Sequence, residues 1–222
     1  MISESRIPRI SEPAPDFDAK STHGQIRLSD YTSKGRWVML FSHPSDFTPV
    51  CSTEFIELAR RQEDFDRLNV QLIGVSIDSV ASHIAWVRDL ERIADVQIKF
   101  PVIADLDQKV SRVYGMVHEV VSDTATVRAV FAIDPKGNIR ALLYYPQQLG
   151  RNVDELLRVF EGLQTIDANS VSCPVNWVPG DQVVVAAPGT VDDAMKRTSN
   201  GDSSLDVTSW YLAKKDLAFP SK

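Results

Sequence analysis

The chain has 222 residues, enough for one sizeable hydrophobic core or for one core with a small appended piece. Hydrophobic residues make up 43% of it and charged residues 24%, a balance that is typical of globular proteins and argues against a disordered chain. The net charge of -6 and the lack of a dense Lys/Arg block argue against nucleic-acid binding.

Two features of the sequence bear on the compartment and on metals. No apolar stretch has the length of a signal-peptide core or the roughly 18 residues of a membrane-spanning helix, so we expect a cytoplasmic protein with no membrane partner. Cys51 and Cys173 form neither a CxxC pair nor a metal-ligand cluster, and the four scattered histidines add no HxxxH pair. We therefore expect free thiols, no metal and no cofactor.

Apolar and amphipathic stretches alternate along the first half of the chain, as expected of an α/β domain. The runs 36–42 and 70–77 are apolar, rich in β-branched residues and too short for helices. They predict neighbouring central strands that are buried on both faces. Apolar residues recur near helical spacing from Phe55 to Leu68 and predict a crossover helix. The amphipathic segment 80–94 predicts another helix.

The alternation continues with a short apolar run at 100–103 and a helical stretch at 108–114. Two β-rich runs within 126–145 flank the turn signal Asp134-Pro135-Lys136-Gly137-Asn138 and predict an antiparallel hairpin. The segment 153–163 predicts a further amphipathic helix.

The main domain is expected to end near Ala168, which gives a domain at 1–168 and a smaller one at 169–222. The smaller segment holds a predicted strand at 182–187, a predicted helix at 191–196 and the apolar cluster Trp210-Tyr211-Leu212. This is too little apolar material for an independent core, so we expect the tail to pack on the main domain or on another subunit.

The stretch from Ser42 to Glu54, SHPSDFTPVCSTE, carries the most informative chemistry. Thr48 suits an N-cap and Pro49 suits the first helical position, so Cys51 is expected in the first turn of a helix. Unpaired backbone N–H groups and the positive end of the helix dipole stabilise a thiolate there. A thiolate is the form that attacks a peroxide, which makes Cys51 a candidate nucleophile. The alternative is a buried, inert cysteine.

Pro44-x-x-x-Thr48-x-x-Cys51 resembles the active-site signature of the peroxiredoxins, and the wider FSHPxDFTPVC resembles their 1-Cys subfamily. Later segments resemble the strand that bears the active-site arginine (VRAVF, 127–131), a later subfamily signature (YP at 145–146 with GRNVDE at 150–155) and the start of the C-terminal domain (PVxW and PGD, 174–181). The resemblance extends from Pro13 over nearly the whole chain. It implies a thioredoxin-like fold with a small C-terminal α+β extension used in dimerisation.

The resemblance also implies a function, that of a thiol peroxidase of the AhpC/TSA type. Such a protein reduces hydrogen peroxide and organic hydroperoxides to water and alcohols through a sulfenic acid, here on Cys51. Its partners would be a small hydroperoxide, an external thiol reductant and a second copy of the chain, with a ring of dimers left open. A peroxide sensor or a redox-switched holdase assembly that uses the same cysteine is the alternative.

Three further residues receive catalytic roles. The Thr48 hydroxyl can hold a peroxide oxygen in line with the sulfur, and Pro44 would wall the pocket. Arg128 lies on a predicted strand face, where a permanent cation is unusual unless an anion lies nearby to pair with it. The resemblance supplies that anion, the Cys51 thiolate. A solvated strand residue is the alternative reading of Arg128.

Three supporting residues each keep a structural alternative. Glu54 would orient Arg128 through a charge-assisted pair, or it only complements the helix dipole. Arg151 matches a second arginine of the subfamily, or it caps the following helix region. His43 matches the subfamily's active-site histidine, or it is an ordinary hydrogen-bonded residue at a strand end.

The number of cysteines in the catalytic cycle depends on Cys173. Archaeal relatives place a resolving cysteine near the position where this chain has Trp210, so the usual C-terminal resolving thiol is missing. No helix start or nearby cation is evident around Cys173 to make it nucleophilic. We therefore expect a 1-Cys cycle in which an external thiol reduces the oxidised Cys51.

Overall fold

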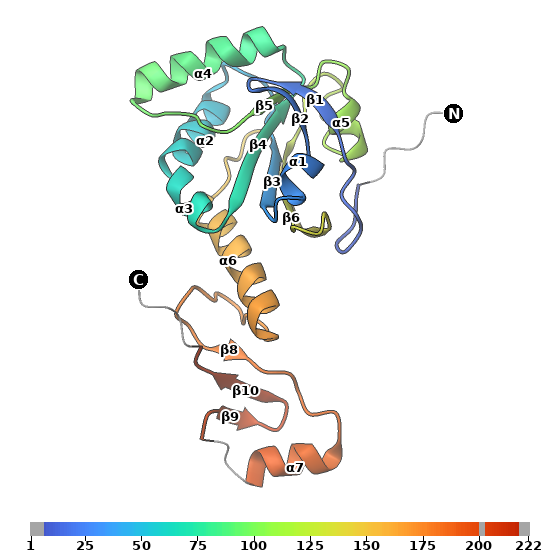
Figure 1. The fold of residues 1–222 in the computed structure, drawn as a ribbon, viewed down its shortest axis with the longest axis vertical. Coiled ribbons are helices and arrows are strands. Elements are labelled where there is room, and N and C mark those ends of the chain that lie inside the picture. The colour runs from blue at the N-terminus through green and yellow to red at the C-terminus, as the bar shows by residue number, and fades with distance from the viewer. Residues whose placement is uncertain (1–6, 200–202, 218–222) are drawn as a thin grey trace, which may run out of the picture. The chain divides into compact units, whose positions relative to one another are not determined.

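The structure is a computed structural model that describes residues 7–199 and 203–217 (Figure 1). The chain divides into two compact units, one that ends at Val153 and one that begins at Asp154. Within the described residues, no helix combines the length and the apolar character needed to cross a membrane.

The first unit is built on a mixed sheet of seven strands in the order β2-β1-β5-β4-β3-β6-β7 (Figure 1). Strands β3, β4 and β5 run parallel, and the other neighbouring pairs are antiparallel. The strands are β1 (Asp18–Ser21), β2 (Gly24–Arg27), β3 (Trp37–Ser42), β4 (Val70–Ser76), β5 (Val102–Ala104), β6 (Arg128–Ile133) and β7 (Ile139–Tyr145). This confirms the predicted α/β class with a thioredoxin-like sheet, and the central pair β3 and β4.

Within the described residues, five helices accompany this sheet. They are α1 (Ser29–Thr32), α2 (Pro49–Arg60), α3 (Gln62–Arg67), α4 (Val80–Ala94) and α5 (Lys109–Val113). The three predicted helical stretches appear in the expected chain order, and the short helix α1 was not predicted. The single crossover helix predicted from Phe55 to Leu68 is wrong in one respect, because the segment forms two helices. The backbone of Arg61 leaves helical geometry at φ -97° and ψ 11°, and α3 then begins anew with Glu63 and Asp64 in its first turn.

The core of the first unit follows from the two-residue period of its strands. Along β3, Val38 and Leu40 point to one face and join a buried cluster with Ile73, Phe131 and other residues. Phe41 belongs to the opposite face, where its ring contacts Phe55 and Phe100 edge-on at centroid distances of 5.6 and 5.7 Å. Because both faces are covered, β3 reads as a continuous apolar run.

The N-terminal hairpin of β1 and β2 is not predicted by the sequence pattern. Its two strands pair antiparallel from Asp18 with Arg27 to Ser21 with Gly24. Their residues are mostly exposed, with Ser21 and Ile26 as the buried exceptions. A hairpin that buries so little shows no apolar alternation, which is the signal that strand prediction relies on.

The second unit holds α6 (Val153–Asn169, whose first residue closes the first unit), α7 (Val191–Ser199) and a three-stranded sheet, β8 (Val183–Val184), β9 (Asp206–Ser209) and β10 (Leu212–Lys215) in the order β8-β10-β9. This confirms the small α+β extension. The predicted strand at 182–187 shortens to two residues, and the predicted helix at 191–196 extends to Ser199. The boundary between 1–168 and 169–222 stays a prediction.

Two further features of the second unit follow from its apolar residues. Val171, Trp177 and Val183 form a small buried cluster. Trp210 and Tyr211 lie in the turn between β9 and β10, with exposed fractions of 47% and 57%. The apolar cluster predicted there is therefore a pair of exposed rings in edge-to-face contact, and only a neighbouring residue, Ala213, is fully buried.

Candidate active site

Cys51 lies in the first turn of α2, as the sequence predicts, and it is fully buried. Thr48 is the N-cap residue with extended backbone, and Pro49 is the first residue of the helix. The predicted capping contact is wrong, because the Thr48 hydroxyl donates to the Ser45 carbonyl at 2.8 Å. That bond leaves the lone pairs of the Thr48 oxygen available to accept a hydrogen bond.

Arg128 contacts the sulfur of Cys51. Its Nη1 lies 3.2 Å from Cys51 Sγ, and its Nε and Nη2 donate to the Gln147 carbonyl at 3.0 and 2.7 Å. The topology explains the meeting: β6 runs antiparallel to β3, so β6 begins beside the end of β3, close to where the chain turns into α2. The side chain is 2% exposed, so the predicted strand-face cation is enclosed with its anion.

Glu54 lies one turn after Cys51 and pairs with two arginines. Its Oε2 accepts from Arg128 at 2.8 Å and from Arg151 Nη2 at 2.6 Å, while Oε1 accepts from the backbone N–H and the Nε of Arg151, both at 2.9 Å. Burial raises the pKa of Glu54, but the Arg151 charge and hydrogen bonds, helped by Arg128, outweigh burial and hold the pKa below its usual value. Two cations facing one carboxylate leave a net positive charge beside Cys51.

Arg151 is buried, and its side chain binds both Glu54 and backbone carbonyls of the central sheet. Besides Glu54, it donates from Nη1 to the carbonyls of Ser42 at 2.9 Å and Ala129 at 3.2 Å. The guanidinium carbon also lies 5.1 Å from the centre of the Phe41 ring. These contacts join β3, α2 and β6. Because they occupy the guanidinium of Arg151, that group does not cap the following helix.

His43 follows β3 and is fully buried. Its Nε2 lies 3.0 Å from Asp46 Oδ1, and its ring packs between Trp86, nearly parallel at 5.1 Å, and Phe55, edge-on at 4.8 Å. Burial lowers the pKa of His43 despite the opposing effect of Asp46. Pro44, the next residue, is half-buried in the loop between β3 and α2.

A second histidine, which the sequence pattern does not point to, joins this group. The Nδ1 of His83 on α4 lies 2.8 and 3.0 Å from the two carboxylate oxygens of Asp46. A cluster of four side chains forms here, in which one ring nitrogen or carboxylate oxygen from each lies within 4.8 Å of the others: His43, Asp46, Asp78 and His83. Linear spacing hides the group, since its members come from two loops and a helix. The available signal was position, because His43 and Asp78 follow the neighbouring parallel strands β3 and β4.

Cys173 belongs to the second unit and is half-buried. Its Sγ lies 3.7 Å from the Gly162 carbonyl. Burial raises the pKa of the Cys173 thiol, and the charge of Arg158 on α6 opposes that effect. The sequence pattern around Cys173 indicates no nearby cation, and the position of Arg158 shows that this expectation is wrong. Both cysteines are free thiols.

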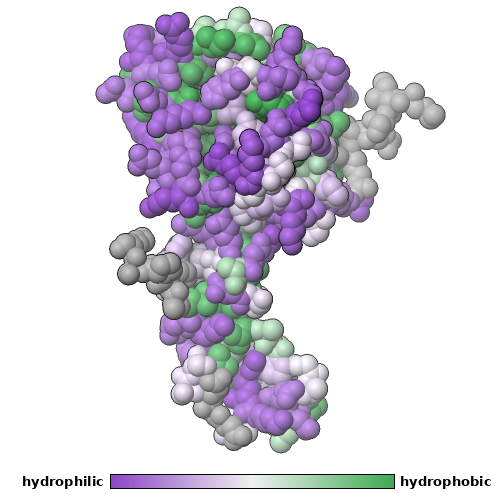
Figure 2. Space-filling model, in the orientation of Figure 1, coloured by the Kyte–Doolittle hydropathy of each residue, from purple (hydrophilic) through white to green (hydrophobic). Residues whose placement is uncertain are grey.

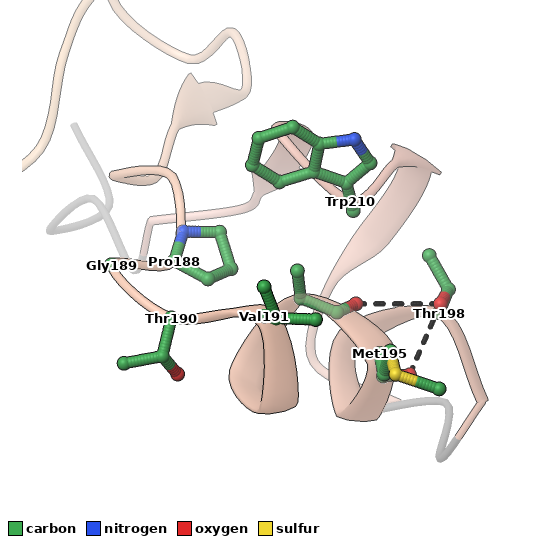
Figure 3. A pocket seen from close by; sticks show the side chains of 8 residues that line it. Pro188, Gly189, Thr190, Val191, Met195, Thr198 and Trp210 are labelled. Carbon is green, nitrogen blue, oxygen red and sulfur yellow. Dashed lines mark hydrogen bonds between the residues drawn. The ribbon is translucent and has the colours of Figure 1, made fainter.

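A pocket of about 460 Å³ in the second unit offers no comparable chemistry (Figure 3). Val191 and Met195 of α7 and the Trp210 ring border it, together with Pro188, Gly189, Thr190, Ala194 and Thr198. Among the described residues, its lining holds no cysteine and no charged side chain. By contrast, the visible surface of the first unit is mainly hydrophilic (Figure 2), and its reactive groups are buried.

Comparisons with known proteins agree with this geometry. A family model described as the AhpC/TSA family matches residues 10–142, and one described as the C-terminal domain of 1-Cys peroxiredoxin matches residues 162–201. A peroxiredoxin of Aquifex aeolicus is 47% identical in an alignment that covers 95% of this chain and 98% of that protein.

Two solved structures are similar over most of their length. The 1-Cys peroxiredoxin of yeast mitochondria has a TM-score of 0.82 at 38% identity, covering 95% of this chain and 100% of its own. A mutant of peroxiredoxin 6 from Arenicola marina has a TM-score of 0.83 at 31% identity, covering 95% and 99%. The yeast structure is described as giving the structural basis of that protein's thiol resolving mechanism via glutathione and thioredoxin systems.

Proposed function

The chain belongs to the AhpC/TSA family and is therefore a peroxiredoxin, a thiol-dependent peroxidase, and we propose that Cys51 is the residue that its peroxide substrate oxidises. The observation that carries this assignment is the contact of 3.2 Å between Arg128 Nη1 and Cys51 Sγ in a fully buried site. A guanidinium donates more strongly to a thiolate than to a neutral thiol, so it favours the nucleophilic form.

In the proposed reaction the Cys51 thiolate attacks the terminal oxygen of a hydroperoxide. The S–O bond forms as the O–O bond breaks, which gives Cys51 sulfenic acid and an alkoxide or hydroxide that takes up a proton and leaves as alcohol or water. Arg128 stabilises the charge that moves from sulfur to the leaving oxygen. Arg151 and Glu54 act through Arg128, because they fix its guanidinium against the sulfur.

Thr48 and Pro44 would place the substrate. The Thr48 hydroxyl already donates to the Ser45 carbonyl, so its oxygen accepts the hydrogen bond of the peroxide O–H and aligns the O–O bond with the sulfur. Pro44 lies in the same loop and would form an apolar wall of the pocket. His43 is a supporting residue, discussed below with its neighbours.

The second half of the cycle is proposed to use an external thiol. A thiol condenses with the sulfenic acid to a mixed disulfide and water, and a second thiol then releases Cys51 and the oxidised reductant. The yeast relative, described with glutathione and thioredoxin systems, supports this class of reductant. The match to a 1-Cys C-terminal domain supports it too, as well as a homodimer built through that domain, with further association into a ring left open.

The test compares Cys51→Ser with Cys173→Ser, since both variants remove one sulfur atom. Cys51→Ser is expected to abolish peroxide consumption with a thiol donor while the circular dichroism spectrum stays unchanged, because a hydroxyl is not ionised at neutral pH. Cys173→Ser is expected to keep most of the activity. Turnover in Cys51→Ser would refute the assignment, and a Cys51–Cys173 disulfide lost together with turnover in Cys173→Ser would refute the 1-Cys cycle.

The same assay separates an enzyme from a sensor. Steady turnover with at least one thiol donor is expected, with intact-mass analysis after one peroxide equivalent showing added oxygen or an added thiol on Cys51. A protein that stalls after one equivalent with every donor would instead be a peroxide sensor or a redox-switched assembly.

A further inference from the structure

A buried carboxylate lies between two buried histidine rings next to the catalytic loop. Asp46 Oδ1 is 3.0 Å from His43 Nε2, and the two Asp46 oxygens are 3.0 and 2.8 Å from His83 Nδ1. Both rings are fully buried, and Asp46 is 5% exposed. An enclosed carboxylate needs a cation partner, and the rings are the two groups in hydrogen-bond contact that can supply one.

The hydrogen bonds identify which ring carries the charge. The Nε2 of His83 lies 3.1 Å from the Ile103 carbonyl, which can only accept, so this nitrogen carries a proton. Its Nδ1 faces the Asp46 carboxylate and therefore carries one as well. His43 differs, since its Nε2 faces Asp46 while its Nδ1 has no partner among the described residues. A protonated Nδ1 without an acceptor would be a buried unsatisfied donor on a charged ring.

The same group holds the loop that carries Thr48. The backbone N–H of Asp46 donates to Asp78 at 3.1 Å, and the hydroxyl of Ser76 donates to the same carboxylate at 2.6 Å. The next residue, Phe47, has a φ of 54°, a left-handed conformation that persists only where the surroundings impose it. Clamping the side chain and the N–H of Asp46 provides that constraint one residue before Phe47.

We propose that His83 is a positioning residue that supplies the charge on Asp46, keeps His43 neutral with its proton on Nε2, and holds the Ser45–Thr48 loop in place. The kinetic part of this inference rests on the proposed role of Cys51, whereas the protonation part does not. His83 lies outside the signature that carries the family resemblance, and it acts through Asp46 without contact to the sulfur.

Removal of His83 should therefore move the charge to His43. In His83→Leu, the Asp46 carboxylate keeps a single ring in contact, so His43 is expected to become doubly protonated. The loop that holds Thr48 then loses one side of its clamp, and the rate constant for oxidation of Cys51 by hydrogen peroxide should fall by about 10- to 100-fold. His83→Asn keeps an N–H donor toward Asp46 and should recover part of that loss.

The first measurement uses the unaltered protein, so it does not depend on whether a variant folds. Nitrogen-15 spectra of the histidine rings at pH 7 should show one doubly protonated ring, assigned to His83, and His43 as a neutral ring protonated on Nε2. Assignment uses His23→Asn and His118→Asn, which remove the other two histidine signals. A neutral His83, or a doubly protonated His43, in the unaltered protein would overturn the proposal.

The variants give the second measurement. Leu90→Ala is the matched control, because Leu90 is a buried residue of the same helix α4 and its removal costs stability without touching Asp46. Its His43 spectrum and its oxidation rate constant should match those of the unaltered protein. A His83→Leu protein with unchanged His43 signals and unchanged rate constant would overturn the proposal, as would a stoichiometric divalent metal found by elemental analysis, since a metal would replace the proton on His83.

Discussion

At the scale of single residues, the site depends on one carboxylate that neutralises only one of the two positive charges buried beside it. Glu54 accepts hydrogen bonds from both Arg128 and Arg151, and Arg128 is left with an N–H directed at Cys51. Charges in a water-excluded site interact more strongly than in bulk water, so the surplus positive charge acts on the sulfur at short range. An arginine is suited to this task because its planar fork can bind Glu54, Gln147 and the sulfur at once.

Arg128→Ala is expected to reduce the rate constant for peroxide reduction by about 10²- to 10³-fold, the usual loss when one donor to a developing charge is removed. Alkylation of Cys51 by iodoacetamide should slow as well, because the sulfur loses the guanidinium that favours its thiolate form. Arg140→Ala on β7 serves as the control, since it removes a cation that contacts Asp134 and Trp37. Unchanged rates of peroxide reduction and of alkylation in Arg128→Ala would remove Arg128 from the site.

At the scale of elements, the site requires α2 to pack closely on the central sheet. Gly74 in β4 makes this possible, because a β-carbon there would lie 3.3 Å from Phe55 Cζ on α2 and 3.4 Å from Phe41 Cζ on β3. The same Phe55 ring contacts His43 and Trp86. The position of the catalytic helix therefore depends on a strand residue without a side chain.

Gly74→Val should destabilise the protein by about 1–3 kcal/mol, the typical cost of overpacking a core, because the two rings must move to admit the side chain. Urea unfolding followed by tryptophan fluorescence measures this loss. Gly189→Ala is the matched control, since nothing lies within 4 Å of a β-carbon there and its φ is ordinary. Equal free energies of unfolding for the two variants would mean that the Phe55 and Phe41 rings can move aside without loss of stability, which would contradict the prediction.

At the scale of the whole molecule, buried carboxylates link the stability of the fold to pH. The two hydrogen-bonded histidines and burial act on Asp46 in opposite directions, and the net effect holds its pKa below the ordinary value of 3.8. Glu54 has its pKa held below 4.5 by its arginines. Both folded pKa values are lower than the unfolded ones, so the stabilisation is complete above about pH 5 and is lost as the pH falls.

We therefore expect the free energy of unfolding to decrease as the pH is lowered from 5 to 3, by up to about 1.4 kcal/mol per pH unit for each group. Urea titrations at closely spaced pH values measure the slope. Asp46→Asn should be less stable at pH 7 but show a shallower slope below pH 5, because one titrating group is gone. A free energy of unfolding that rises as the pH falls through this range would contradict the assignment of both carboxylates.

The extent of successful prediction varied with how local each signal was. The helix at 80–94 and the strands near 36–42 and 70–77 were predicted nearly to the residue, since buried elements show clear periodicity. The exposed hairpin of β1 and β2 has no such signal, and the break at Arg61 lies inside an uninterrupted helical pattern. The helix start at Pro49 was predicted because capping chemistry is local, although the Thr48 hydroxyl found a different partner.

The sequence by itself determined the nucleophile candidate, its place in the first turn of a helix, and the family that the signature around Cys51 resembles, because these depend on residues adjacent in the chain. Only the tertiary structure decided that Glu54 pairs with both arginines and that Asp46 lies between His43 and His83. Those contacts join residues that are far apart in the chain. They form where β3, β4 and β6 bring their ends together, and the protonation of a buried group follows from the partners that surround it there.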